Sequence, residues 1–285
     1  MGLRNFLLLG IFAILPTQAG GRTLLLPAIE SAKGIGALEL VMEQEPEAQD
    51  PGQPLFVCAE YAPVPKTLLC LSNFVETMNL AFLRSSIWTE GLYGNPFHVV
   101  VDHGNRSYLQ NLERARGHDL RSLDLFNFFN AVDSLCGTEK RYCLSSVEAD
   151  FRKAVFTPFA RLNQSFVLLG FALRRNIFSK PPYRPFLGHE IYHSQYFNSL
   201  RYRDVVNKFW KTMVSESDKE KIKTQLRQTY NIDDSNHPDL LLNEFQAYLL
   251  QPEANQAMLK DFVSRYQAEL KRMLAEHGIV LHSIE

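Results

Sequence analysis

The stretch PFLGHEIYHSQYF, residues 185 to 197, places two histidines four residues apart, with a glutamate directly after the first. In an α-helix, residues four apart lie on one face, so His189 and His193 can present both imidazoles to a single cation. Zinc accepts such nitrogen ligands, and Glu190 can reach a metal-bound water as a general base. The spacing H-E-x-x-H therefore predicts a catalytic zinc helix, with two histidines that merely share a helix face as the alternative.

A catalytic zinc generally needs a third protein ligand and an open position for water. The longer pattern H-E-x-x-H-x-x-G-x-x-H is excluded, because Tyr196 and Ser199 stand where it has glycine and histidine. The helical segment HPDLLLNEFQAYLLQ, residues 237 to 251, instead offers Glu244 on a mostly apolar helix. Burying an unpaired carboxylate there is unfavourable, and a cation would offset this. We therefore expect Glu244 to be the third ligand, with a solvated Glu244 at the helix edge as the alternative.

These motifs resemble the gluzincin zinc metallopeptidases, the broad class that includes thermolysin. The resemblance lies in GHEIYH, residues 188 to 193, in NEFQAY, residues 243 to 248, and more loosely in the helix and strand expected before them. It implies a zincin-like fold, with zinc bound by His189, His193 and Glu244 and with Glu190 as the base. Two features depart from the class. The gap between His193 and Glu244 is 50 residues (244 − 193 − 1), longer than in thermolysin, and Tyr248 replaces the aspartate of N-E-x-x-x-D.

The class also implies a side chain that stabilises the oxyanion of a tetrahedral intermediate, commonly a histidine or a tyrosine. Tyr248 lies one turn after Glu244 on the expected helix, and His237 lies two turns before it. Both are candidates for this catalytic role. Should the third zinc ligand lie elsewhere, Asp239 or His237 is the next choice.

The first nineteen residues, MGLRNFLLLGIFAILPTQA, have the pattern of a cleavable secretory signal. Arg4 precedes an apolar run from residue 6 to residue 15, and small residues surround Ala19. This run is too short for a membrane-spanning helix, which needs about 20 residues. We expect an exported protein, periplasmic or secreted, whose mature chain begins near Gly20. An uncleaved membrane anchor is the alternative.

Charge argues against two classes of partner. The chain has 30 basic and 31 acidic residues and a formal net charge of −1. The chain has neither a basic cluster nor an excess of basic residues, so its charge gives no sign of binding to nucleic acid or to a membrane surface. We expect a peptide or protein substrate, no nucleic acid, no stable membrane span and a monomeric protein.

The four cysteines form an even set, which in an exported chain usually means disulfides. Of the three possible pairings, proximity in sequence favours Cys58–Cys70 and Cys136–Cys143. A zinc knuckle built from these thiols is the alternative, and the absence of any C-x-x-C spacing disfavours it.

Periodicity predicts an α+β fold with a small N-terminal β-sheet and a mostly helical C-terminal part. Residues 20 to 53 read as an N-terminal extension and linker, and residues 54 to 285 as the zincin-like domain. Strands are expected in PLFVCAEY (54–61) and FHVVVDHG (97–104). Helices are expected at residues 69–88, 122–135, 147–162, 202–213, 217–230, 237–251 and 255–278.

The leading hypothesis is an exported zinc-dependent endopeptidase, an enzyme that hydrolyses peptide bonds through a metal-activated water. Its substrate backbone would add to an edge strand, for which FHVVV (97–101) and FALRRNIF (171–178) are the candidates. One alternative is a zinc-binding scaffold or pseudoenzyme that binds a protein partner, its metal closed by His237 or Asp239. Another is a metal-free helical adaptor with a chance motif.

Overall fold

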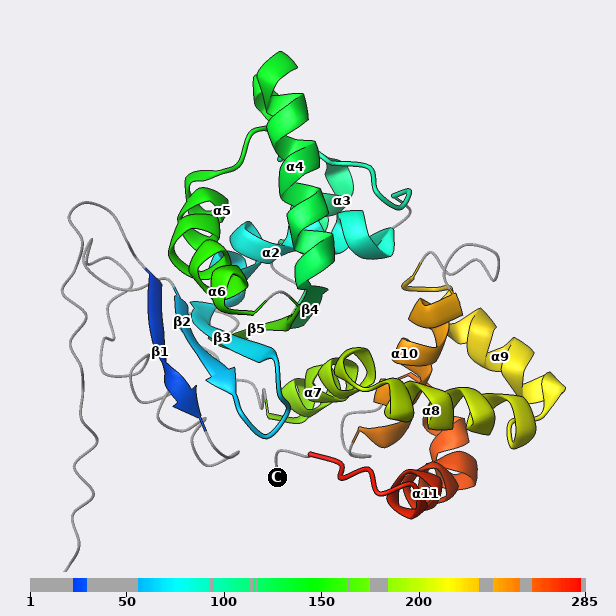
Figure 1. The fold of residues 1–285 in the computed structure, drawn as a ribbon. Coiled ribbons are helices and arrows are strands. Elements are labelled where there is room, and N and C mark those ends of the chain that lie inside the picture. Colours follow the sequence, from blue (N-terminus) through cyan, green and yellow to red (C-terminus); the bar gives the residue numbers. More distant parts are fainter. Residues whose placement is uncertain are drawn as a thin grey trace, which may run out of the picture.

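The computed structural model shows a sheet with its covering helices, followed by a group of C-terminal helices (Figure 1). The predicted signal and His237 lie outside the described residues. Among the described helices, none combines the length and the apolar character that crossing a bilayer requires. The described residues are 23–29, 56–92, 95–112, 115, 117–163, 165–174, 184–230, 238–251 and 258–282.

A mixed five-stranded sheet has the order β1-β2-β3-β5-β4. Its strands are β1 (Thr23–Ile29), β2 (Phe56–Tyr61), β3 (Thr67–Phe74), β4 (Gly117–Arg121) and β5 (Val167–Arg174). β2 and β3 form an antiparallel pair, as do β4 and β5, whereas β1 runs parallel to β2 and β3 runs parallel to β5. The two edges of the sheet are therefore β1 and β4.

Both faces of the sheet are buried, because successive strand residues point to opposite sides. Phe56 and Cys58 face one core, whereas Val57 and Ala59 face another. Each large apolar side chain removed from water contributes about 1.5–3 kcal/mol. Burial on both sides explains why β2, β3 and β5 read as continuous apolar runs rather than as alternating ones.

Among the described residues, four helices cover the face of the sheet that carries Phe56 and Cys58, and α7 covers the face that carries Val57 and Ala59 (Figure 1). On the first face they are α2 (Val75–Glu90), α4 (Ser122–Thr138), α5 (Ser146–Phe151) and α6 (Thr157–Leu162), and the shorter α3 (Arg106–Asn111) follows α2. A π-helical turn, Arg152–Phe156, joins α5 to α6, and a 3-10 turn, Lys140–Tyr142, follows α4.

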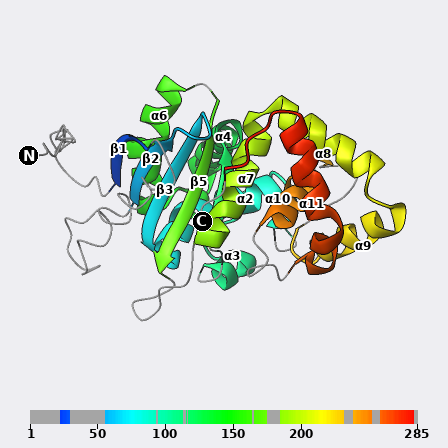
Figure 2. The same ribbon diagram turned by 90° about the horizontal axis from the view of Figure 1, so that it is seen from below.

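The C-terminal part is helical, as predicted. It contains α7 (Arg184–Asn198), α8 (Leu200–Thr212), α9 (Glu216–Leu226), α10 (Pro238–Leu250) and α11 (Lys260–Glu276). Figure 2 shows α8, α10 and α11 beside the sheet, with α7 between them and the sheet. α10 supplies Phe245, Leu249 and Leu250 to a core that α8, α9 and α11 complete. The α+β class, the small sheet and the helical C-terminal part are confirmed.

Several predicted elements were wrong in detail. The helix expected at residues 69–88 begins only at Val75, because residues 67–74 form β3 and pair with β2 and β5. A short apolar run fits a buried strand as well as a helix, and the pairing decides. The extension expected at residues 20–53 contains β1, which joins the sheet.

The expected strand at residues 97–104 is also wrong: these residues form turns and irregular structure. His98 has a positive φ of 58°, Val99 is exposed, and Val101 is held by Arg84, whose Nε donates to its carbonyl at 2.9 Å. A β-branched run does not make a strand without a neighbour to pair with. Neither proposed substrate edge is an edge strand, because the described part of 171–178 belongs to β5, inside the sheet.

Both predicted disulfides are formed. Cys58 and Cys70 are directly opposed on β2 and β3, and Cys136 is linked to Cys143 after the end of α4. No free cysteine remains in the described residues. Such bonds persist in oxidising compartments, in accordance with an exported protein.

Candidate metal centre

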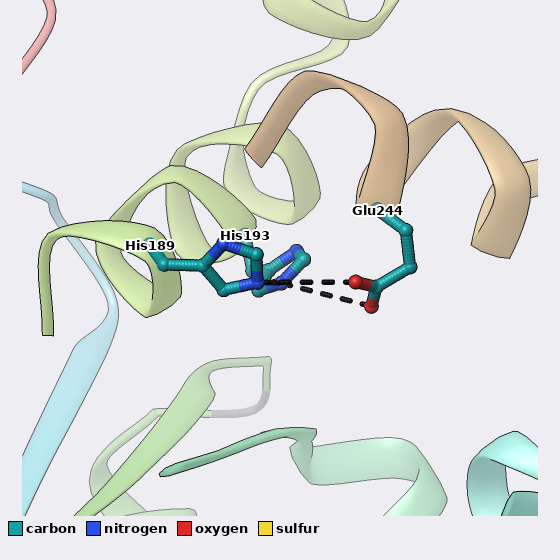
Figure 3. Close-up of side chains that lie close together, drawn as sticks. All are labelled: His189, His193 and Glu244. Carbon is teal, nitrogen blue, oxygen red and sulfur yellow. Dashed lines mark hydrogen bonds and ion pairs between the residues drawn. The ribbon is translucent and has the colours of Figure 1, made fainter. Parts of the chain in front are cut away.

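Helix α7 presents different residues to different neighbours, which is why it can carry a buried polar site. Leu187 and Ile191 pack under the sheet, and Tyr192 joins the core of the C-terminal helices. His189 and His193 lie one turn apart on another side, toward α10 (Figure 3). The apolar contacts fix the helix, and the helix fixes the two imidazoles.

The three predicted ligands converge. The Nε2 atoms of His189 and His193 are 2.9 Å apart. Glu244 reaches them from α10, with Oε2 3.8 Å from Nε2 of His189 and Oε1 3.7 Å from Nε2 of His193 (Figure 3). The side chains are at most 9 % exposed. Two helices separated by a long stretch of sequence thus bring two nitrogens and a carboxylate to one point.

The donor set fits a zinc ion. Ligand atoms about 2.1 Å from a tetrahedral zinc lie about 3.4 Å from one another and can be at most about 4.2 Å apart. The three separations observed, 2.9, 3.7 and 3.8 Å, fall within this limit. Oε2 of Glu244 is buried without a hydrogen-bond partner, and a buried carboxylate oxygen without one is unfavourable. A cation between the three side chains would satisfy it.

Glu190 faces the edge strand β4. A Cβ added to Gly117 of β4 would collide with Oε1 of Glu190 and would come within 2.9 Å of Cζ of Phe171. The missing side chain at Gly117 therefore leaves the space that the Glu190 carboxylate occupies. Sequence reasoning had not connected these two residues, because strand pairing and helix packing bring them together.

A second group shares His193 with the first. Asp119 of β4, Glu190 and His193 place potential ligand atoms within 4.8 Å of one another, and Oδ2 of Asp119 lies 3.9 Å from Nδ1 of His193. The sequence analysis missed Asp119, because it lies in a five-residue strand with no motif around it. Asp239, the alternative ligand, is exposed and belongs to neither group.

Burial and mutual charge control protonation at the site. Burial alone would lower the pKa of His193, but nearby carboxylates, chiefly Asp119 and Glu244, raise it to about 9. Burial raises the pKa of Glu244 to about 7, against the attraction of His193. Burial and the charge of His193 hold the pKa of His189 well below its usual value. Metal binding would therefore displace protons from this site.

Acidic side chains outnumber basic ones around the centre. Burial, together with the charge of Asp119, raises the pKa values of Glu190 and of Glu90, the last residue of α2, well above their usual range. The sequence analysis had not singled out Glu90. With Glu244, four carboxyl groups meet in one cleft, and among the described residues no lysine or arginine lines it. A divalent cation would stabilise the ionised forms of these carboxyl groups.

Two tyrosines complete the site. The ring centroid of Tyr248 lies 4.5 Å from that of His189, and its hydroxyl is 3.1 Å from that of Tyr230. The Tyr230 hydroxyl also favours the ionised form of Glu244, because it lowers the pKa of that carboxyl. Tyr248 was predicted as an oxyanion donor and lies at the centre, whereas His237 is outside the described residues. Tyr230 was missed because it is the last residue of the helix expected at 217–230 and has no motif of its own; in the structure α9 already ends at Leu226.

The centre opens into a cleft of about 360 Å³ between the sheet half and the helical half. Glu90, Gly117, Glu190, Tyr230 and Glu244 are among the residues that line it. This volume is in the range of ligand pockets, about 300–1,000 Å³.

Comparison with known proteins gave no match: no protein family, no curated protein and no solved structure corresponds to this chain. Functional inference therefore rests on the site itself.

Proposed function

We propose that this protein is an exported zinc-dependent endopeptidase of the gluzincin type, with a zincin-like catalytic domain. The observation that carries the proposal is the convergence of His189, His193 and Glu244, with an unpartnered buried oxygen on the last. A glutamate beside the centre and two phenol hydroxyls in the same cleft supply the remaining chemistry. The two disulfides support export.

Zinc, when bound, would supply a Lewis acid that polarises the scissile carbonyl and acidifies a water. Glu190 would accept the proton of the attacking water and pass it to the leaving amine. Burial raises the pKa of Glu190 above its usual range, which favours its holding the proton between the two steps. Tyr248 or Tyr230 would donate a hydrogen bond to the oxyanion.

The edge strand β4 offers a place for the substrate backbone. An edge strand has N–H and C=O groups on its outer side that no neighbouring strand uses. β4 carries Gly117 and Asp119 past Glu190 and His193, so a peptide added to this edge would run along the centre. β4 thus replaces the two edge strands expected from the sequence.

Replacement of Glu190 by glutamine tests the proposal. The amide cannot accept the proton, and loss of a general base lowers the rate by about 10²–10⁴-fold. Cleavage of a broad peptide library and zinc content per chain would be measured for the wild type and for E190Q. Glu76→Gln is the matched control, because Glu76 is exposed on α2. We expect both variants to hold one zinc and only E190Q to be nearly inactive.

Other results would decide for an alternative. Equal turnover by the wild type and E190Q, zero included, with one zinc per chain would favour a zinc-binding scaffold that binds a protein partner. A purified wild-type protein without affinity for zinc would favour the metal-free adaptor.

A further inference from the structure

We propose that Asp119 of the edge strand β4 is a positioning residue that holds His193 in the orientation required of a metal ligand. The inference rests on the metal centre of the proposed function. It concerns the side of the imidazole that faces away from Glu244, where the sequence motifs assign no partner.

The two nitrogens of His193 have different surroundings. Nε2 faces the centre, 2.9 Å from Nε2 of His189 and 3.7 Å from Oε1 of Glu244. Nδ1 is buried and has no hydrogen-bond partner. If Nε2 binds a metal, Nδ1 must carry the ring proton, and a buried N–H needs an acceptor. Oδ2 of Asp119, at 3.9 Å, is within ion-pair range of it.

Asn243 strengthens the link between strand and helix. It is 1 % exposed and directly precedes Glu244 on α10. The Asn243 amide favours the charged form of both neighbours, because it lowers the pKa of Asp119 and raises the pKa of His193. A carboxylate and an amide from two elements thus converge on the outer side of one imidazole. Partners of this kind fix the tautomer and the ring orientation of ligating histidines.

The alignment of β4 with α7 delivers Asp119 to this place. Gly117 approaches Glu190, Asp119 approaches His193, and the Arg121 guanidinium lies 5.3 Å from the ring centroid of Phe197. Two strand residues advance about 6.6 Å, and one helical turn advances about 5.4 Å, so every second residue of the strand meets successive turns. The position of Asp119 therefore follows from the packing that also aligns Gly117.

The test is Asp119→Asn, which keeps the shape of the side chain and removes its charge. Zinc affinity would be measured by competition with a chelator, the visible absorption of the Co²⁺-substituted protein would be recorded, and thermal unfolding would be followed without metal. Asp124→Asn is the matched control, because Asp124 is buried nearby but pairs with Arg121. Asp119→Ser serves if the amide variant does not fold.

We expect D119N to bind zinc about 10–100-fold more weakly than the wild type. We also expect an altered Co²⁺ spectrum and an unchanged or higher unfolding temperature of the metal-free protein. A purely structural role would lower that temperature and leave the spectrum unchanged, so this result would overturn the inference. Unchanged affinity, or an equal loss in D124N, would do the same.

Asp119, Glu190 and His193 could instead form a second cation site. Two ions per wild-type chain and one per D119N chain would overturn the positioning role in favour of that site. A wild-type protein that binds no zinc would overturn the proposed metal centre itself. If the wild type binds one zinc and D119N binds it equally well, only the inference about Asp119 is lost.

Discussion

Gly117 of β4 and Glu190 of α7 approach each other so closely that a Cβ at position 117 would collide with the Glu190 carboxylate. The contact joins the edge of the sheet to the helix that carries both histidines. It places the proposed base beside the strand on which we expect the substrate to lie. The relationship makes Gly117 a sensitive probe of the site, because any Cβ there must displace the Glu190 carboxylate.

Gly117→Ala should lower activity without removing the metal. Displacing a catalytic group by about 1 Å can lower the rate by about 10²-fold, and overpacking lowers stability by about 1–3 kcal/mol. The values of kcat/KM, zinc content and the free energy of unfolding would be measured. Gly137→Ala in α4 is the control, because nothing lies within 4 Å of its added Cβ. Full activity in G117A would mean that the position of Glu190 is not critical.

Glu244→Gln should weaken zinc binding. The amide keeps the shape of the side chain but lacks the charge that balances the cation. Loss of a direct ligand should exceed the about 10–100-fold effect of losing an outer partner. Zinc affinity would be measured by chelator competition, with E76Q as the control. Full zinc content and activity in E244Q would place the third ligand elsewhere, with Asp239 or His237 as the next choice.

Tyr230→Phe and Tyr248→Phe should identify the oxyanion donor. Loss of one such donor lowers kcat by about 10²–10³-fold. The hydroxyl that donates directly should give the larger decrease in kcat, with zinc content and KM little changed. The other hydroxyl, 3.1 Å away, should give a smaller effect because it only orients the first. Wild-type kcat in both single variants and in the double variant would exclude the tyrosines and turn attention to His237.

His118 should make the metal-free protein less stable in acid. It is 4 % exposed, accepts a hydrogen bond from Ser86 and donates one to Asn79, and burial lowers its pKa to about 3. In the unfolded chain the pKa of His118 is about 6.5, so its imidazole takes up a proton as the pH falls. In the folded chain the same imidazole stays neutral down to about pH 3. Its contribution is therefore fully present above about pH 6.5 and is lost progressively as the pH falls toward 3.

Urea unfolding with a chelator present, at about pH 7 and about pH 5, would measure this effect. His118 alone should account for a loss of about 2 kcal/mol between these conditions. His118→Gln should lose correspondingly less, because glutamine does not titrate. Equal losses in the two proteins would show that His118 is not the group responsible.

Local features of the sequence determined much of this protein. The spacing of His189 and His193 predicted a shared helix face, and the apolar periodicity around Glu244 predicted the helix that carries it. Proximity in sequence favoured both disulfides. The helical C-terminal part was predicted because apolar residues recur there at spacings of three and four. Such signals succeed because neighbours along a helix or a short loop are neighbours in space as well.

Only the tertiary structure decided which strand lies at the edge beside the centre and which side chains it brings there. The apolar residues around Cys70 form a strand, and those at residues 97–104 do not, because strands require partners that lie far away in the sequence. Asp119, Gly117 and Tyr230 carry no local pattern. Their roles arise where the sheet, α7 and α10 pack together. Burial there makes an isolated carboxylate such as Asp119 part of the metal centre, which its neighbours in sequence do not indicate.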